Sequence, residues 1–300
     1  MEEAELKTGI GRDIELYASP LAFNDKVLLD VYGAGTSDWN GSCWLERRCS
    51  SICGLEYVLE GTGRIVVSGE SHDLAPGDVF LLHLHEHHAY GARNCAQWKK
   101  IWFVFGHDFI TEAMLHLGLL TESRIRIPES ERPGIEADFR RIFTLMKEQP
   151  PGFRIQTSTV AYELLHHLSH IAASHGNATP APPSLLRAVR YANDHLGEPL
   201  TVEQLSRSAY CSRIHLTRLF KRHFGVAASV WIRSSRMSYA GHLLATTDIP
   251  VKTIAAQVGY TDPLHFSAAF HKVMEQTPSD FRRQHLHDAR RYTAPHPQPR

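Results

Sequence analysis

The feature that most constrains this chain is a segment that occurs twice, about fifty residues apart. Residues 201–225 read "TVEQLSRSAYCSRIHLTRLFKRHFG", and residues 251–275 read "VKTIAAQVGYTDPLHFSAAFHKVME". An offset of 50 aligns Leu205 with Ala255, Ala209 with Gly259, Tyr210 with Tyr260, Ser212 with Asp262, His215 with His265, Leu216 with Phe266 and Phe220 with Phe270. Such a repeat indicates a duplicated supersecondary unit, here a helix–turn–helix at about 201–224 and again at 251–274.

Residues with helix-capping chemistry stand at the expected ends of these helices. Thr201 and Gln204 have the spacing of a capping box, and Ser212 is a natural N-cap. Asp262 followed by Pro263 is a second N-cap with proline in the first helical position. Residues 228–246 predict a longer helix that joins the units. Two units that enter consecutive major grooves need a separation of about 34 Å.

Charge divides the chain in the same place. Residues 1–183 carry 24 acidic and 16 basic side chains, whereas residues 184–291 carry 8 acidic and 15 basic ones. A basic half beside an acidic half indicates that only the basic half binds a polyanion. A plain helical interaction domain is the alternative, but the duplication, the charge and the caps together favour binding of double-stranded DNA.

The basic half resembles the AraC-type family of bacterial transcriptional regulators from about Leu186 to Arg283. The resemblance is carried by "HLTRLFKRHFG", "WIRSSRMSYAGHLLATTDIPVKTIAAQVGYTD", "HFSAAFHK" and "TPSDFRR". It implies a DNA-binding domain over 185–292 and, commonly, transcriptional activation with RNA polymerase as a partner. Three residues depart from the family pattern: Ala268, His271 and Glu275 replace an arginine, a lysine and a glycine.

The outward face of each recognition helix supplies the candidate DNA contacts. In the first, we expect Arg218 to bridge guanine O6 and N7, Ile214 to touch a thymine methyl, and the other cations to hold phosphates. The second has no arginine on this face, so we expect backbone and shape contacts from it. The candidates are Arg213, Ile214, Thr217, Arg218, Lys221 and Arg222 in the first helix, and Leu264, His265, Ser267 and His271 in the second.

The acidic half, residues 1–175, reads as short strands between about 26 and 106, followed by three helices at 108–119, 133–149 and 153–174. Its segments "YVLEGTGRIVVSG", "LAPGDVFLLHLHEHHAYG" and "WKKIWFVFG" resemble, more loosely, the cupin-like sensing barrel that many members of the family place before the DNA-binding domain. The predicted fold is therefore α+β with two domains: a cupin-like β-barrel with helices, then an all-α domain with two helix–turn–helix motifs. A Pro-rich linker at 176–184 separates them, and 293–300 reads as a disordered tail. The apolar stripes of the second and third helices either pair two subunits, as the expected homodimer requires, or pack on their own barrel; the stripe of the third helix includes Ile155.

The resemblance also implies a small-molecule effector, of which a sugar is the favoured class. Tyr90 and Trp102 match family positions that supply an aromatic ring, and polar neighbours would fix the hydroxyl groups. The candidate effector-binding residues are Arg47, Arg48, His88, Tyr90, Lys100 and Trp102.

The stretch "LLHLHEHHAYG" holds His83, His85, His87 and His88 and leaves two alternatives open. If it is one extended strand, three of these imidazoles lie along about 13 Å and cannot grip one ion without partners. No earlier strand supplies the His-x-His pattern of metal-binding cupins. A metal-responsive regulator is thus the first rival to a sugar-responsive one, and a pH sensor is a minor alternative.

Other classes find little support in the sequence. There is no basic, apolar leader and no apolar run of membrane-spanning length, and five cysteines without a C-x-x-C pair do not form a disulfide framework. We expect a cytoplasmic protein without a cofactor. No nucleophile–base–orienter set is evident, so a cupin-type enzyme with a degenerate DNA-binding tail is the weaker rival.

Overall fold

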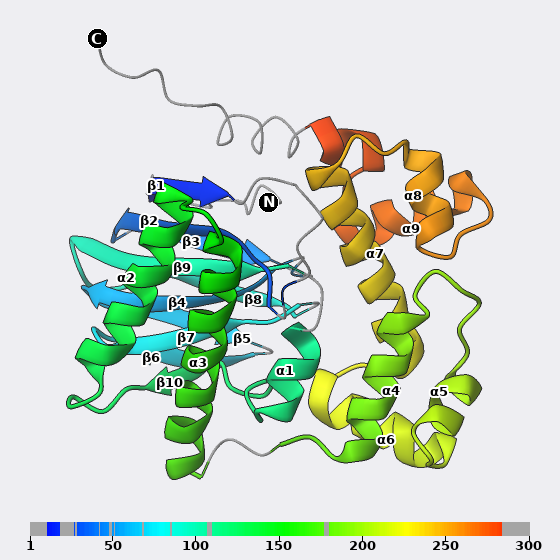
Figure 1. The fold of residues 1–300 in the computed structure, drawn as a ribbon, viewed down its shortest axis with the longest axis horizontal. Helices are drawn as coiled ribbons and strands as arrows, with labels where there is room; N and C mark the ends of the chain where they lie inside the picture. The colour runs from blue at the N-terminus through cyan, green and yellow to red at the C-terminus, as the bar shows by residue number, and fades with distance from the viewer. Residues whose placement is uncertain are drawn as a thin grey trace.

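The computed structural model describes residues 11–18, 27, 29–41, 43–47, 50, 52–67, 69–84, 86–106, 110–176 and 180–283. Figure 1 shows a β-rich part beside a helical part, which we call the β domain (residues 11–176) and the helical domain (residues 183–283). The expected tail at 293–300 lies outside the described residues.

The β domain is built from two antiparallel sheets. The larger has the order β1-β2-β9-β4-β7-β10, and the smaller has the order β3-β8-β5-β6. The bounds of the larger sheet are β1 Gly11–Ala18, β2 Val31–Asn40, β4 Cys53–Glu60, β7 Asp78–Leu82, β9 Gln97–Phe105 and β10 Arg124–Arg126. Those of the smaller are β3 Trp44–Arg47, β5 Gly63–Val67, β6 Glu70–Leu74 and β8 His88–Ala92.

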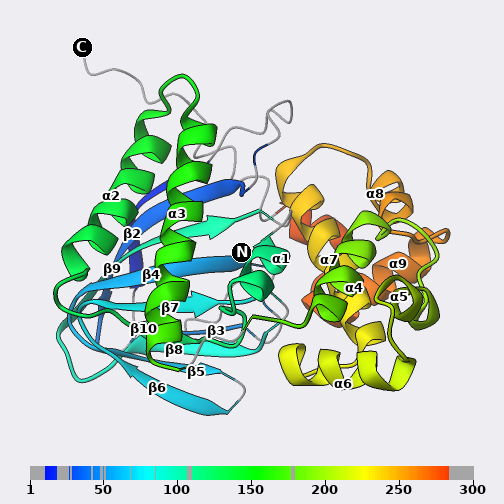
Figure 2. The same ribbon diagram turned by 60° about the horizontal axis from the view of Figure 1, so that its bottom comes forward.

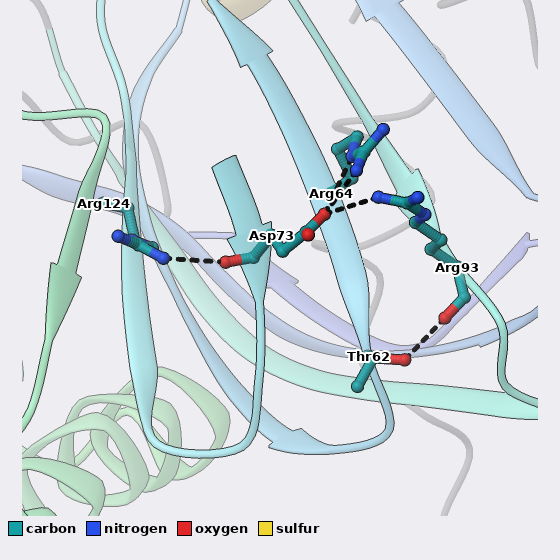
Figure 3. Close-up of polar contacts among 5 residues, drawn as sticks. All are labelled: Thr62, Arg64, Asp73, Arg93 and Arg124. Atoms are coloured by element: carbon teal, nitrogen blue, oxygen red, sulfur yellow. Dashed lines mark hydrogen bonds and ion pairs between the residues drawn. The ribbon is translucent and has the colours of Figure 1, made fainter. Parts of the chain in front are cut away.

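A polar cluster ties the edge strands of the two sheets together (Figure 3). The carboxylate of Asp73 on β6 accepts from Arg64 at 2.8 Å and from Arg93 at 2.7 Å. The backbone carbonyl of Asp73 accepts from Arg124 on β10 at 3.0 Å. These side chains are partly exposed to solvent, so each ion pair contributes little to the stability of the domain.

Alternation along the strands of the larger sheet separates two apolar cores. Odd-numbered side chains of β9, such as Phe103, pack with β4 and β7 against α2 (Arg132–Glu148) and α3 (Phe153–Ser174). Even-numbered ones, such as Trp98, face the smaller sheet, where Ile65 and Tyr90 join them. Figures 1 and 2 show α2 and α3 lying across the outer face of the larger sheet.

The apolar stripe of α3 belongs to this outer core. Val160, Leu164, Leu168 and Ile171 are at most 1% exposed within the single chain. The stripe therefore packs on its own domain, as the second alternative from the sequence held. Ile155 was wrongly placed in the stripe, because it is 60% exposed on another face of the helix.

A short helix, α1 (Ile110–His116), joins the two domains. Ile110 and Met114 belong to the outer core of the β domain, whereas Leu115 belongs to the core of the helical domain. Glu112 accepts from Arg190 at 2.9 Å, and the Leu115 carbonyl accepts from the backbone of Ala181 at 2.9 Å. Arg190 lies on α4 (Pro183–Asp194), so α1 connects the β domain to the first helix of the helical domain.

The helical domain contains the two predicted helix–turn–helix units. The first is α5 (Val202–Ser208) with α6 (Arg213–Phe224), and the second is α8 (Val251–Gln257) with α9 (Pro263–Met274). The predicted caps are confirmed: Thr201 and Gln204 form a capping box, Ser212 accepts from the His215 amide, and Asp262 accepts from the Leu264 amide. Helix α7 (Ala228–Thr246) joins the units, which lie towards its two ends in Figure 1.

The uniform offset of 50 is wrong in the first helix of each unit. Recognition helices α6 and α9 are offset by 50, but α5 and α8 are offset by 49, so Leu205 corresponds to Ile254 instead of Ala255. Tyr210, with φ 51°, corresponds to Gly259, with φ 81°, and the second turn is one residue longer. The spacing of the buried residues and the position of the left-handed turn residue establish the offset of 49. Matching residue types, such as Tyr210 with Tyr260, does not reveal it.

No helix in the described part of the chain is long and apolar enough to cross a membrane.

Candidate effector and DNA-binding sites

Five of the six sequence-predicted effector residues lie in one buried region between the two sheets. Lys100 and Trp102 come from β9, His88 and Tyr90 from β8, and Arg47 from β3. Each is less than a tenth exposed. The sixth, Arg48, lies outside the described residues. Strand alternation brings the five together, because they occupy the inward positions of facing strands.

The centre of this region is a buried ion pair inside a ring of aromatic side chains. The ammonium of Lys100 lies 2.5 Å from a carboxylate oxygen of Glu56, and both side chains are almost fully buried. The ammonium is also 3.9 Å from the centroid of the Trp39 ring, and the rings of Tyr90 and Trp98 follow at 4.8 and 4.7 Å. Carboxylate and π-faces together compensate for the water that this ammonium has lost.

Hydrogen bonds extend the ion pair towards Arg47. The hydroxyl of Tyr90 donates to Glu56 at 2.8 Å and accepts from Arg47 at 3.4 Å. The same guanidinium nitrogen lies 3.4 Å from Nε2 of His88. Burial, and then the charge of Arg47, hold the pKa of His88 well below its usual range, so the ring is neutral near pH 7.

Two ring nitrogens in this region have unmet hydrogen-bonding capacity. Within the described residues, Nδ1 of His88 and Nε1 of Trp98 are buried without a hydrogen-bond partner. Trp102, in contrast, donates from Nε1 to the Ser37 hydroxyl at 2.8 Å. A buried polar atom without a partner is costly, and a ligand that supplies the partner recovers that cost.

Sequence reasoning missed Trp39 and Glu56, which complete the ring and the ion pair. Trp39 stacks on Tyr90 with ring centroids 5.5 Å apart and planes 7° apart. A signal for Glu56 was present, since a carboxylate inside the apolar run "GLEYVLE" requires a buried cation. The signal did not identify the cation as Lys100, because the two residues are 44 positions apart.

The histidine-rich stretch is not one strand. Strand β7 ends at Leu82 and β8 begins at His88, so residues 83–87 form the connection between them. His83 is buried with Nε2 2.9 Å from the carbonyl of Glu122, whereas His87 is exposed and lies 3.1 Å from Glu46. His85 is outside the described residues. Within the described residues, no three His, Cys, Asp or Glu side chains come together as a metal site.

The first recognition helix lines an open groove of about 840 Å³. Arg213, Ile214, Thr217, Arg218 and Lys221 all contribute to its walls. The arginines and the lysine are exposed, as is Arg222 further along α6. The carboxylate of Glu203 on α5 lies 3.9 Å from Arg213 and 3.4 Å from Arg207, so an acidic group shares this basic surface.

The second recognition helix presents a different surface. Leu264, His265 and His271 are exposed, and Ser267 is half-buried with its hydroxyl donating to the Pro263 carbonyl at 2.8 Å. Thr217 makes the equivalent bond in α6, to the Arg213 carbonyl at 2.8 Å. Both hydroxyl protons are thus used inside the helices and are not available to bases.

Both parts of the chain match family models. Residues 37–165 match an AraC-like ligand binding domain, and residues 205–284 match a helix-turn-helix domain. A ligand-binding β domain followed by a duplicated helix–turn–helix defines a DNA-binding transcription regulator with a ligand-binding domain. The chain belongs to the AraC family of transcriptional regulators.

Relatives of known function cover most of the chain. The arabinose operon regulatory protein of Salmonella typhimurium is 27% identical over 234 residues, 76% of this chain and 82% of that protein. The lactose operon transcription activator of Staphylococcus xylosus is 24% identical over 251 residues, with 76% and 82% covered. The crystal structure of unsaturated fatty acid bound ToxT from Vibrio cholerae superposes with a TM-score of 0.56 at 13% identity, over 83% of this chain and 94% of that one, and shows that the two-domain fold is shared.

Proposed function

We propose that this protein is a transcriptional activator whose binding to specific DNA sequences is controlled by a sugar held between the two sheets. The observation that carries the effector class is the aromatic ring around the Lys100–Glu56 pair. Sugars stack their apolar faces on aromatic rings and bind charged or polar side chains through their hydroxyls. The arabinose and lactose regulators among its relatives support the same class.

The effector would act through β9 and α1. Strand β9 carries Lys100 and Trp102 and precedes α1 in the chain, and α1 contacts α4 of the helical domain. A sugar that binds two arrangements of this contact with different affinity changes the fraction of protein competent for DNA.

The remaining parts of the proposal come from the sequence. Residues 1–175 bind the effector and form a homodimer, and 185–292 bind the promoter and contact RNA polymerase in the cytoplasm. The expected linker at 176–184 is shorter at its end, because α4 begins at Pro183. The buried stripe of α3 is not accessible to a second subunit. The homodimer would instead use the exposed Ile155 and Tyr162, which lie seven positions apart on α3.

Two measurements on the intact protein test the proposal. Thermal-shift screening against pentoses, hexoses and disaccharides should find a sugar that raises the melting temperature, because a ligand of the native state stabilises it. DNA affinity, measured by fluorescence anisotropy, should then change with that sugar and fall steeply between about 50 and 200 mM salt.

A matched pair of tyrosine variants localises the effector. Tyr90→Phe removes a hydroxyl bonded to Glu56, and Tyr57→Phe removes one from the opposite face of β4. We expect a sugar affinity about fivefold weaker for the first and unchanged for the second, as one hydrogen bond predicts. Equal losses in both variants, or no sugar that shifts the melting temperature, would refute the assignment of the pocket.

A further inference from the structure

The two recognition helices share an unusual feature at the same position. Ile214 is the second residue of α6 and is 70% exposed, and Leu264 is the second residue of α9 and is 81% exposed. Both helices have twelve residues and start after an N-cap that bonds to the first turn, so the two side chains are in equivalent positions. A single exposed apolar side chain is ordinary on a protein surface, but here one occurs at the same place in both copies of a repeat.

Basic side chains around Ile214 identify what would cover it. In the groove of the first unit it lies among Arg213, Arg218 and Lys221, a surface suited to a polyanion and unsuited to an apolar protein partner. In the DNA major groove, the apolar group available to such a side chain is the C5-methyl of thymine.

The next helical turn distinguishes the two units. Four residues further along, on the same face, α6 has Arg218 and α9 has Ala268. Arginine pairs with guanine through two hydrogen bonds, whereas alanine offers only a methyl group, which again suits thymine. Thr217 and Ser267, between these positions, donate their hydroxyl protons to their own backbone and so do not compete for bases.

We propose that Ile214 and Leu264 each read a thymine methyl, so that the operator contains two unequal boxes one helical turn apart. Both boxes have thymine at the equivalent place; the box read by α6 adds a guanine contacted by Arg218, and the box read by α9 adds no guanine. The 19-residue helix α7 between the units is about 28 Å long, close to the repeat of about 34 Å between successive major grooves. This inference rests on the proposed sequence-specific DNA binding and specifies its chemistry.

Selection of binding sites from random duplexes by the full-length protein gives the first test. We expect an enriched pair of boxes about 10 base pairs apart, with a shared thymine and a guanine in only one. If no sequence is enriched, the proposed function fails together with this inference. If boxes are enriched without the shared thymine, only the inference is overturned.

Deoxyuridine gives the sharper test, because it removes only the methyl group. With the wild-type protein, replacing either key thymine by deoxyuridine should weaken binding about fourfold, the effect of one methyl-sized apolar contact. The Leu264→Ala protein should lose its response to deoxyuridine in the second box and keep it in the first, and Ile214→Ala should do the reverse.

Val230→Ala, which truncates an exposed apolar side chain in the first turn of α7, is the matched control and should leave both responses intact. Since Ile214 and Leu264 are exposed, their alanine variants should melt at the wild-type temperature. A wild-type protein that binds thymine and deoxyuridine equally, or a Leu264→Ala protein that still distinguishes them in the second box, would overturn the inference.

Discussion

Adjacent lysines of β9 form ion pairs in opposite environments. Lys99 binds Glu60 at the surface, where the glutamate is 62% exposed, and Lys100 binds Glu56 in the interior. Removing one partner of a buried pair leaves the other charge without compensation. We expect Glu56→Gln to lower the free energy of unfolding by about 3–5 kcal/mol, as measured by urea denaturation.

Glu60→Gln is the control for this prediction. A surface pair contributes at most about 1 kcal/mol, so this variant should unfold near the wild-type urea midpoint. A Glu56→Gln protein of unchanged stability would show that the Lys100 ammonium does not depend on this carboxylate.

His88 makes stability depend on pH. Because burial keeps its folded pKa far below 6.5, the unfolded chain takes up a proton below about pH 6.5 that the native chain does not. Stability is therefore lost as the pH falls. Half-buried Glu86 acts in the opposite sense: desolvation raises its pKa to about 7, so between about pH 4.5 and 7 the native chain holds a proton that the unfolded chain lacks.

Replacing His88 by Gln should flatten the acid side of the stability profile. Between pH 6 and pH 5, the loss in free energy of unfolding should shrink by up to about 1.4 kcal/mol relative to wild type, the value of one proton per pH unit. Urea denaturation at the two pH values measures this. An identical loss in both proteins would mean that His88 is protonated in the native state.

Five candidate effector residues that the sequence identified lie together in the structure, but the sequence did not predict the hydrogen-bond partners of their polar groups. Residues such as Trp39 and Glu56 are recognised only when the strands are in register. That register depends on irregularities, such as the shift between Val58 and Glu60 in β4, which no composition rule reveals.

At the scale of elements, the helices were the more predictable part. Helix α3 begins and ends at the predicted residues, and the caps of α5, α6 and α9 were identified from their own chemistry. Local hydrogen bonds determine these features, so local sequence suffices. The alternation in "LLHLHEHH", in contrast, continues past Leu82, where β7 ends, and the next strand, β8, begins at His88 in the other sheet.

The turns of the two units should respond in opposite ways to substitution. Tyr210 has a side chain in the left-handed region, which costs about 1 kcal/mol relative to glycine. Tyr210→Gly should therefore raise the free energy of unfolding by up to this amount. The gain is reduced by loss of the cation–π contact, in which the Arg187 guanidinium lies 5.3 Å from the centroid of the Tyr210 ring.

Gly259→Ala should lower stability by 1 kcal/mol or more, about the left-handed cost. Its new Cβ would also lie 3.1 Å from the carbonyl oxygen of Leu196 and 3.0 Å from Arg236. Thermal and urea unfolding of the full chain measure both variants. If both substitutions changed stability in the same direction, a left-handed backbone at both Tyr210 and Gly259 would be contradicted.

At the scale of the molecule, Glu112 and Arg190 form an ion pair between the two domains. In allosteric proteins, the affinities with and without effector commonly differ about 5–150-fold. We expect Arg190→Ala to bring the ratio of the two DNA affinities close to one, because it removes this contact between the domains. Fluorescence anisotropy at saturating effector measures this ratio.

Arg187→Ala is the comparison for this experiment. Arg187 lies on the same helix but donates to the Ala209 carbonyl inside the first helix–turn–helix unit. This variant should change DNA affinity with and without effector by a similar factor, so the ratio is preserved. A preserved ratio in Arg190→Ala as well would exclude this contact from the signal.

Leu115 of α1 belongs to the same buried cluster as Leu185, Ala188 and Val189 of α4, so the core of the helical domain includes a residue from the β domain. A protease cut near residue 178 would leave the fragments associated until denaturant separates them. A recombinant helical fragment that starts at residue 183 would carry an uncovered apolar spot on α4. Such a fragment should be less soluble than the intact chain, and adding the β domain in trans should protect it.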